Sequence, residues 1–223
     1  MTLLARLEDA VAALALAGVS ALPLQAQTTG KFLAPRDQIV AVKAARMFDS
    51  RSGTLLNNQT VVIRGDRILD VGANPQIPAG ARVIDLGNAT LMPGMVDAHV
   101  HVNTGGNTAA QRALIAAANA LTDLEAGFTT VLDMDSRGGF NTVDLRDAIN
   151  AGLLQGPRMQ VVGESLNQRA TNYYADTQSV RFYEGFTEDK NVNGPWLARA
   201  AVREAKLHGV DWVKIYTTQD CEG

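Results

Sequence analysis

The sequence predicts an α/β protein in which a small antiparallel β-domain precedes a parallel sheet with crossover helices. Residues 39–92 contain short apolar runs broken by turns, which is typical of a small sheet. From Met95 onward, strand-like runs alternate with helical stretches, and this rhythm implies parallel pairing with right-handed crossovers. We therefore place the β-domain at 27–92 and the β/α part at 93–223 of the 223 residues.

Short β-like runs make up the predicted β-domain, at residues 39–44, 60–64, 67–72 and 81–86. Gly65 and Asp66 separate the second run from the third, and a two-residue connection of this kind is typical of a hairpin. Both observations favour antiparallel pairing in this part of the chain.

The β/α part is expected to follow the order strand 95–100, helix 108–126, strand 129–133, helix 143–151, strand 158–162, helix 195–208 and strand 211–216. A glycine closes each predicted helix, as expected of a left-handed cap residue. The long segment 164–194 shows no clear periodicity. Both a substrate-facing loop and a solvated insertion remain open for it.

The N-terminus is typical of a secretory signal. An apolar, alanine-rich stretch at 10–22 follows Arg6 and precedes a small residue where a signal peptidase would cut. The stretch is too short to cross a bilayer comfortably, so no stable membrane span is predicted. Glu8 and Asp9 depart from a positive n-region, and an ordinary amphipathic helix is the alternative. A signal at 1–26 predicts a periplasmic or secreted protein.

The overall charge and the cysteine content exclude some partners and linkages. A net charge of −3 gives no electrostatic reason to expect nucleic acid or an acidic membrane surface as a partner. Cys221 is the only cysteine in the sequence, so an intramolecular disulfide is impossible.

Two of the three histidines lie two residues apart at the end of an apolar run. In a β-strand, His99 and His101 point to the same face, about 7 Å apart along the backbone. Neutral imidazole is a good ligand for zinc and related metals. Such a pair is often only core or surface, but its place at the C-terminal end of a strand favours a metal site. Asp97 shares their parity, and both a supporting role and simple packing remain open for it.

Other polar residues receive structural interpretations. His208 falls in the last turn of a predicted helix, where it interacts with the helix dipole and needs no metal. Asp133 and Asp135 lie at the end of the second predicted strand of the β/α part, and Glu164 follows the third. We interpret them as solvated loop acids, with orientation of a substrate as the alternative.

Four segments in order resemble the amidohydrolase superfamily, and its imidazolonepropionase-like and Xaa-Pro dipeptidase-like branch in particular. Residues 91–101 resemble the first-strand signature, in which Pro-Gly leads into Asp-x-His-x-His. Residues 127–131, 156–159 and 209–215 resemble the second, third and fourth strand segments. The resemblance covers roughly residues 39–219, and several motifs in order are more specific than any one alone.

The resemblance implies the N-terminal half of a TIM-type (β/α)8 barrel, with about four β/α units. It also implies that His99 and His101 bind the more buried of two divalent metals, expected to be zinc, with iron or manganese possible. Lys214 would bridge both metals as a carbamate formed with carbon dioxide. Burial disfavours the lysine cation and promotes the neutral amine that reacts.

The implied activity is hydrolysis of an amide-type C–N bond in a small-molecule or peptide substrate, through a metal-activated hydroxide. A peptide, a dipeptide or a cyclic amide would each suit this chemistry. The later histidines and the catalytic aspartate of the family pattern have no counterpart before Gly223, so no catalytic base is assigned.

Two alternatives remain open. The chain could be a truncated, inactive fragment or an assembly half that folds or binds only with a complementary segment, and its open sheet edges could promote self-association. It could also be a plain α/β module that binds metal through His99 and His101 alone, although two ligands seldom retain a metal tightly.

Overall fold

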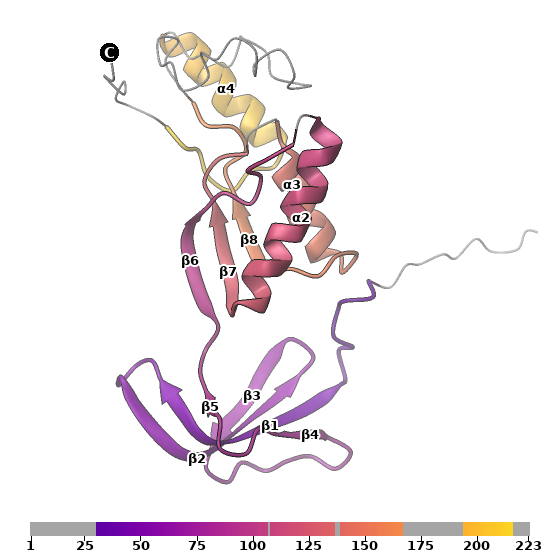
Figure 1. The fold of residues 1–223 in the computed structure, drawn as a ribbon, viewed down its shortest axis with the longest axis vertical. Helices are drawn as coiled ribbons and strands as arrows, with labels where there is room; N and C mark the ends of the chain where they lie inside the picture. Colours follow the sequence, from indigo (N-terminus) through magenta and orange to yellow (C-terminus); the bar gives the residue numbers. More distant parts are fainter. Residues whose placement is uncertain (1–29, 107, 137–138, 167–193, 216–223) are drawn as a thin grey trace, which may run out of the picture.

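The computed structural model describes residues 30–106, 108–136, 139–166 and 194–215. The predicted secretory signal and most of the 164–194 segment lie outside the described residues. Two separate sheets follow each other along the chain, and residues 92–94 connect them (Figure 1). Within the described ranges, every helix is too short or too polar to cross a membrane.

The first sheet is mixed, which corrects the prediction of an antiparallel sheet. It contains β1 (Ile39–Asp49), β2 (Thr54–Arg64), β3 (Arg67–Gly72), β4 (Arg82–Asp85) and β5 (Thr90–Leu91). The predicted hairpin is confirmed, because β2 pairs with β1 and β3 in antiparallel fashion. However, β4 and β5 run parallel to β1, since the chain after β3 crosses to the far side of β1 instead of turning back.

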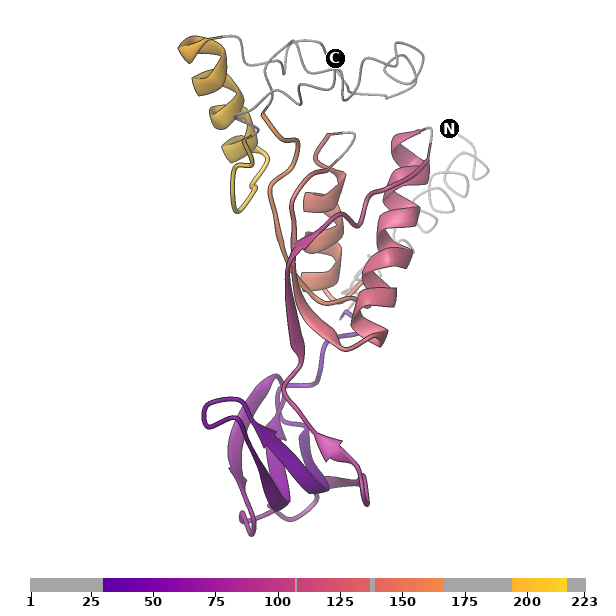
Figure 2. The ribbon, with the colours of Figure 1, turned by 60° about the vertical axis from the view of Figure 1, so that its left-hand side comes forward.

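The second sheet has the parallel pairing that the strand–helix rhythm predicts. Its strands are β6 (Met95–Val100), β7 (Phe128–Asp133) and β8 (Arg158–Val161), in that order. Figure 2 shows that α2 (Ala109–Glu125) and α3 (Asn141–Asn150) both lie on one face of this sheet. The core between them consists of Val102, Ala116, Ala120, Val131, Val143, Leu145, Met159 and Val161.

Local signals fix the ends of these helices. The hydroxyl of Thr108 accepts a hydrogen bond from the backbone N–H of Gln111 and so caps the start of α2. Gly127 follows α2 with a φ of 97°, a conformation that favours glycine, and the chain then enters β7 directly. The last helix, α4 (Pro195–Leu207), begins with proline, as the sequence predicts.

The predicted fourth strand is not formed as such. Ile215 makes a single parallel bridge to Leu166, and Tyr216 lies outside the described residues. Asp211 explains the difference, because its side chain accepts the Val161 N–H that a backbone carbonyl would take in a regular ladder. The segment is attached to β8 both by the side chains of Asp211 and Trp212 and by their backbone N–H groups, which donate to the Val161 carbonyl.

The glycine of the Pro-Gly pair before β6 is required for a steric reason. A Cβ atom on Gly94 would overlap the side chain of Thr129 on the neighbouring strand. Only glycine lets the chain approach β7 so closely at the point where β6 begins.

We therefore predict that Gly94→Ala lowers the free energy of unfolding by about 1–3 kcal/mol, since overpacking forces the backbone to shift. Urea unfolding followed by circular dichroism measures the change. In a Thr129→Gly background the loss should largely disappear, and Gly72→Ala, where a Cβ meets open space, is the control. An equal loss in both backgrounds would contradict the steric explanation.

Candidate metal centre

The structure brings the two predicted histidine ligands together. The ring centroids of His99 and His101 are 5.2 Å apart, and the rings are tilted by 58°. His99 lies near the C-terminal end of β6 and is exposed, whereas His101 follows the strand and is half-buried. The Nδ1 atom of His101 is itself buried. The imidazole of His99 is thus exposed to solvent, whereas that of His101 is partly buried.

An irregularity in β6 shapes this pair. Asp97 pairs in register with Val131, and Val100 pairs with Asp133, so three steps along β6 match two along β7. The carboxylate of Asp97 accepts the backbone N–H of His99 at 2.9 Å within this irregular stretch. Of the two roles left open for Asp97, this bond fits the supporting one, since it holds the backbone that carries His99.

A cavity of about 340 Å³ adjoins His101 between the end of β6 and helix α2. Its lining is largely polar and consists of Val100, His101, Val102, Thr104, Asn119, Thr122 and Asp123. Burial raises the pKa of Asp123, and the charge of Asp97 raises it further. A group that reaches His101 from this side therefore meets both an imidazole and a carboxyl.

The spacing of the imidazoles suits a shared metal ion. Zinc binds an imidazole nitrogen at about 2.0–2.1 Å, so two rings on one ion have centroids within about 6 Å of each other. The observed 5.2 Å meets this condition. Across the part of the chain that the structure describes, no three His, Cys, Asp or Glu side chains are grouped to hold a metal. Tight binding would need a further donor.

Lys214, the third predicted ligand, lies at the opposite end of the strand order from the histidines. Its backbone carbonyl accepts the N–H of Leu166 at 2.9 Å, in the segment beside β8. Strands β7 and β8 lie between this segment and β6. The two histidines thus lie side by side, whereas Lys214 lies beyond the other end of the sheet, with its side chain half-buried.

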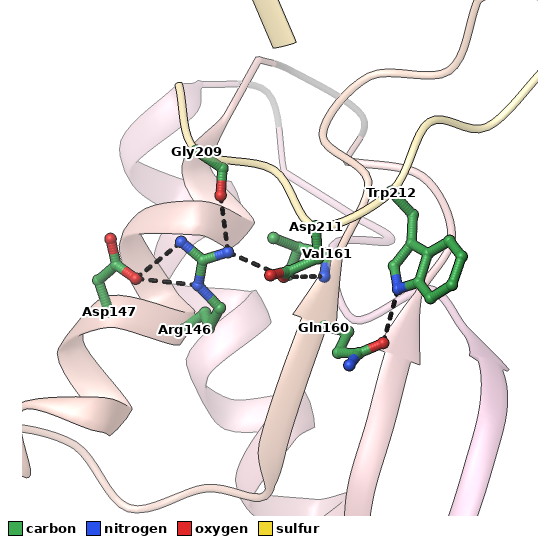
Figure 3. Close-up of polar contacts among 7 residues, drawn as sticks. All are labelled: Arg146, Asp147, Gln160, Val161, Gly209, Asp211 and Trp212. Atoms are coloured by element: carbon green, nitrogen blue, oxygen red, sulfur yellow. Dashed lines mark hydrogen bonds and ion pairs between the residues drawn. The ribbon is translucent and has the colours of Figure 1, made fainter. Parts of the chain in front are cut away.

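A polar network holds the segment that carries Lys214 (Figure 3). The Nη1 atom of Arg146 donates to the carboxylate of Asp211 and to the carbonyl of Gly209, each at 2.8 Å. Burial alone would lower the pKa of Arg146, but its hydrogen bonds to Asp211 and Asp147 outweigh this and raise it. The guanidinium is therefore held as a cation between helix α3 and the segment.

The structure corrects the interpretation of Asp133, Asp135 and Glu164 as solvated loop residues. Asp133 is 0% exposed and Asp135 is 2% exposed, whereas Glu164 is half-buried and accepts the Gly139 N–H at 2.7 Å. Burial raises the pKa of Asp133 to about 6, against the lowering effect of the hydrogen bond that the Val102 N–H donates to it. Alternation along the strand from the apolar Val131 is the sequence signal that would have indicated a buried Asp133.

His208 behaves as the sequence analysis expects of a structural residue. It directly follows α4, and its ring stacks on Phe140 with centroids 3.8 Å apart.

Comparison with known proteins gives the family. Residues 90–214, more than half of the chain, match the amidohydrolase family. A dihydroorotase from Pediococcus pentosaceus is 36% identical over 96 residues, which are 43% of this chain and 21% of that protein. An imidazolonepropionase from Streptomyces avermitilis is 30% identical over 109 residues, 41% of this chain and 26% of that protein.

The fold is similar to that of a solved structure. A crystal structure of a Xaa-Pro dipeptidase with bound methionine in the active site superimposes with a TM-score of 0.68 and 27% identity, over 82% of this chain and 48% of that one. The chain therefore belongs to the amidohydrolase family, in its imidazolonepropionase-like and Xaa-Pro dipeptidase-like branch. It spans about half the length of the dipeptidase and a smaller share of the curated relatives.

Because the carboxyl of Asp133 is buried, we predict that the stability of the protein depends on pH. The pKa of Asp133 is about 6 in the folded state against 3.8 for an ordinary aspartate, so folding is favoured while the group is protonated. The contribution of Asp133 to the free energy of unfolding should fall by up to about 3 kcal/mol as the pH rises from 4 to 7. Urea titrations at both pH values measure this. Asp133→Asn should remove that part of the pH dependence, whereas Asp66→Asn, at an exposed position, should not. If the free energy of unfolding changed equally between the two pH values in the parent and both variants, the prediction would be refuted.

Proposed function

We propose that this chain supplies part of the metal centre of a hydrolase that cleaves amide-type C–N bonds. The observation that carries the proposal is the imidazole pair at the C-terminal end of β6, with 5.2 Å between ring centroids. Barrel enzymes build their sites at that end of the strands. Membership in the amidohydrolase family supports the same assignment.

His99 and His101 would hold a divalent metal, with Lys214 as a bridging donor to a second one after carboxylation by carbon dioxide. Zinc is the expected metal, and iron or manganese would accept the same ligands. A metal bound there would lower the pKa of a water molecule and polarise a substrate carbonyl. Asp97 holds the backbone N–H of His99 and thereby keeps the imidazole in place.

The relatives indicate the range of substrates. By name they are a dihydroorotase, an imidazolonepropionase and a Xaa-Pro dipeptidase. For this chain we propose a peptide, a dipeptide or a cyclic amide. The proposed architecture is the first half of a TIM-type barrel, to which β6, β7, β8 and residues 211–215 contribute.

A second candidate is an assembly half that is inactive alone. Two imidazoles and one lysine form a sparse ligand set, and β6 pairs on one side only among the described strands. Such an edge can associate with another chain. This candidate predicts negligible hydrolysis by the isolated 223-residue chain and a concentration-dependent oligomer.

Metal binding tests the site directly. We expect His99→Ala and His101→Ala each to weaken zinc binding by at least about tenfold, because each removes one of few ligands. Isothermal titration calorimetry on the 223-residue chain measures the affinity. His208→Ala removes the remaining histidine, which stacks on Phe140, and serves as the matched control. Unchanged affinity in the first two variants would end the metal-site proposal.

Hydrolysis tests whether this chain alone carries a complete site. With zinc and bicarbonate present, we expect the isolated chain to release little product from a proline dipeptide or a cyclic imide. Ninhydrin detection and ultraviolet absorbance follow the two reactions. Robust turnover that disappears in His101→Ala would show that this chain alone completes the site, against the assembly-half alternative.

A further inference from the structure

We propose that Arg146 and Asp211 form a clamp that positions Lys214, a role that rests on the function proposed above for that lysine. The clamp consists of the carboxylate of Asp211, the guanidinium of Arg146 and the backbone of Val161 (Figure 3). Neither side chain is itself a metal ligand or a reacting group in this proposal.

Asp211 attaches the segment to β8 through two hydrogen bonds. Its Oδ2 atom accepts the Val161 N–H at 2.9 Å, and its own N–H donates to the Val161 carbonyl at 2.8 Å. A single residue thus satisfies both backbone groups of the last residue of the strand. Buried strand groups need such partners, so this pairing selects one register for the segment.

Arg146 links that attachment to helix α3. Its Nη1 atom donates to both Asp211 and Gly209, while its Nε and Nη2 atoms contact Asp147 at 2.9 Å. The side chains of Arg146 and Asp211 are 12% and 35% exposed, so water screens their charge-assisted bond less than it screens a fully exposed pair, whereas Asp147 is 62% exposed. The pair between Arg67 and Asp66 differs, since those side chains are 85% and 73% exposed and 3.6 Å apart.

The clamp lies three residues before Lys214, and a second anchor follows at once. The indole Nε1 of Trp212 donates to Gln160 on β8 at 2.6 Å. The Lys214 carbonyl accepts the Leu166 N–H at 2.9 Å. The backbone between these anchors has little freedom, so the position from which the lysine side chain extends is set by Asp211 at one end and Leu166 at the other.

The experiment measures docking of the segment without any metal. Hydrogen exchange of the Leu166 amide reports on its bond to the Lys214 carbonyl, and Trp212 fluorescence reports on the indole once the exposed Trp196 is replaced by Phe. In the full chain, we expect Arg146→Met and Asp211→Ala to accelerate Leu166 exchange about ten- to hundredfold and to increase quenching of Trp212 by acrylamide. Arg146→Lys should restore part of the protection, because an ammonium can still reach the carboxylate.

Arg67→Gln is the control for loss of an exposed ion pair, and it should change neither signal. Unfolding midpoints and circular dichroism, recorded for every variant, show that the comparison is made on folded protein. If the unfolding midpoint falls but Leu166 exchange and Trp212 quenching stay as in the parent, Arg146 and Asp211 are merely stabilising and the clamp is overturned.

A second measurement separates this proposal from the function on which it rests. With ¹³C-bicarbonate and zinc, NMR detects a carbamate carbonyl that Lys214→Ala abolishes, and Arg146→Met should reduce that signal at least about fivefold. If the parent shows no carbamate while the clamp variants still undock the segment, the function proposed for Lys214 fails and the docking role of the clamp stands. A full carbamate signal in undocked variants would overturn the clamp as a positioning device.

Discussion

Burial of one face of the β6-β7-β8 sheet against helices α2 and α3 is the constraint on which the rest of the structure depends. Val131, Met159 and Val161 lie on that face together with apolar side chains of both helices. Because side chains alternate along a strand, this burial fixes the register of three parallel strands and brings their carboxyl ends to one edge. The histidine pair, the buried aspartates and the docking site for the last segment all occur at that edge.

Local sequence signals predicted much of this arrangement. The hairpin at Gly65 and Asp66 and the helix end at Gly127 each depend on a few neighbouring residues, and the structure confirms both. The pairing of His99 with His101 is local in the same sense, since a strand places residues i and i+2 side by side. Parallel pairing followed from the alternation of strands and helices, which leaves few other topologies.

The features that the sequence did not predict depend on distant residues. The parallel entry of β4 beside β1 reflects the route of the chain after β3, which no local pattern encodes. The irregular register of β6 arises between two strands, so no pattern within β6 alone predicts it. The segment after Gly209 has a strand-like composition, yet the Asp211 side chain occupies the place of a backbone partner. In each case the outcome depends on contacts between residues that are distant in the sequence.

This division between local and distant determinants bears on how a metal centre could assemble here. The two imidazoles lie on one short stretch of chain, supported by Asp97, so their spacing is set as soon as β6 forms beside β7. Lys214 reaches the sheet only after the chain has passed through α4, and its place depends on bonds to β8 and α3. In the proposed metal centre, metal affinity would depend on the folding free energy, because the ligands come from opposite ends of the sheet. The docking of residues 209–215 is therefore the step at which stability and metal binding would become one property of this protein.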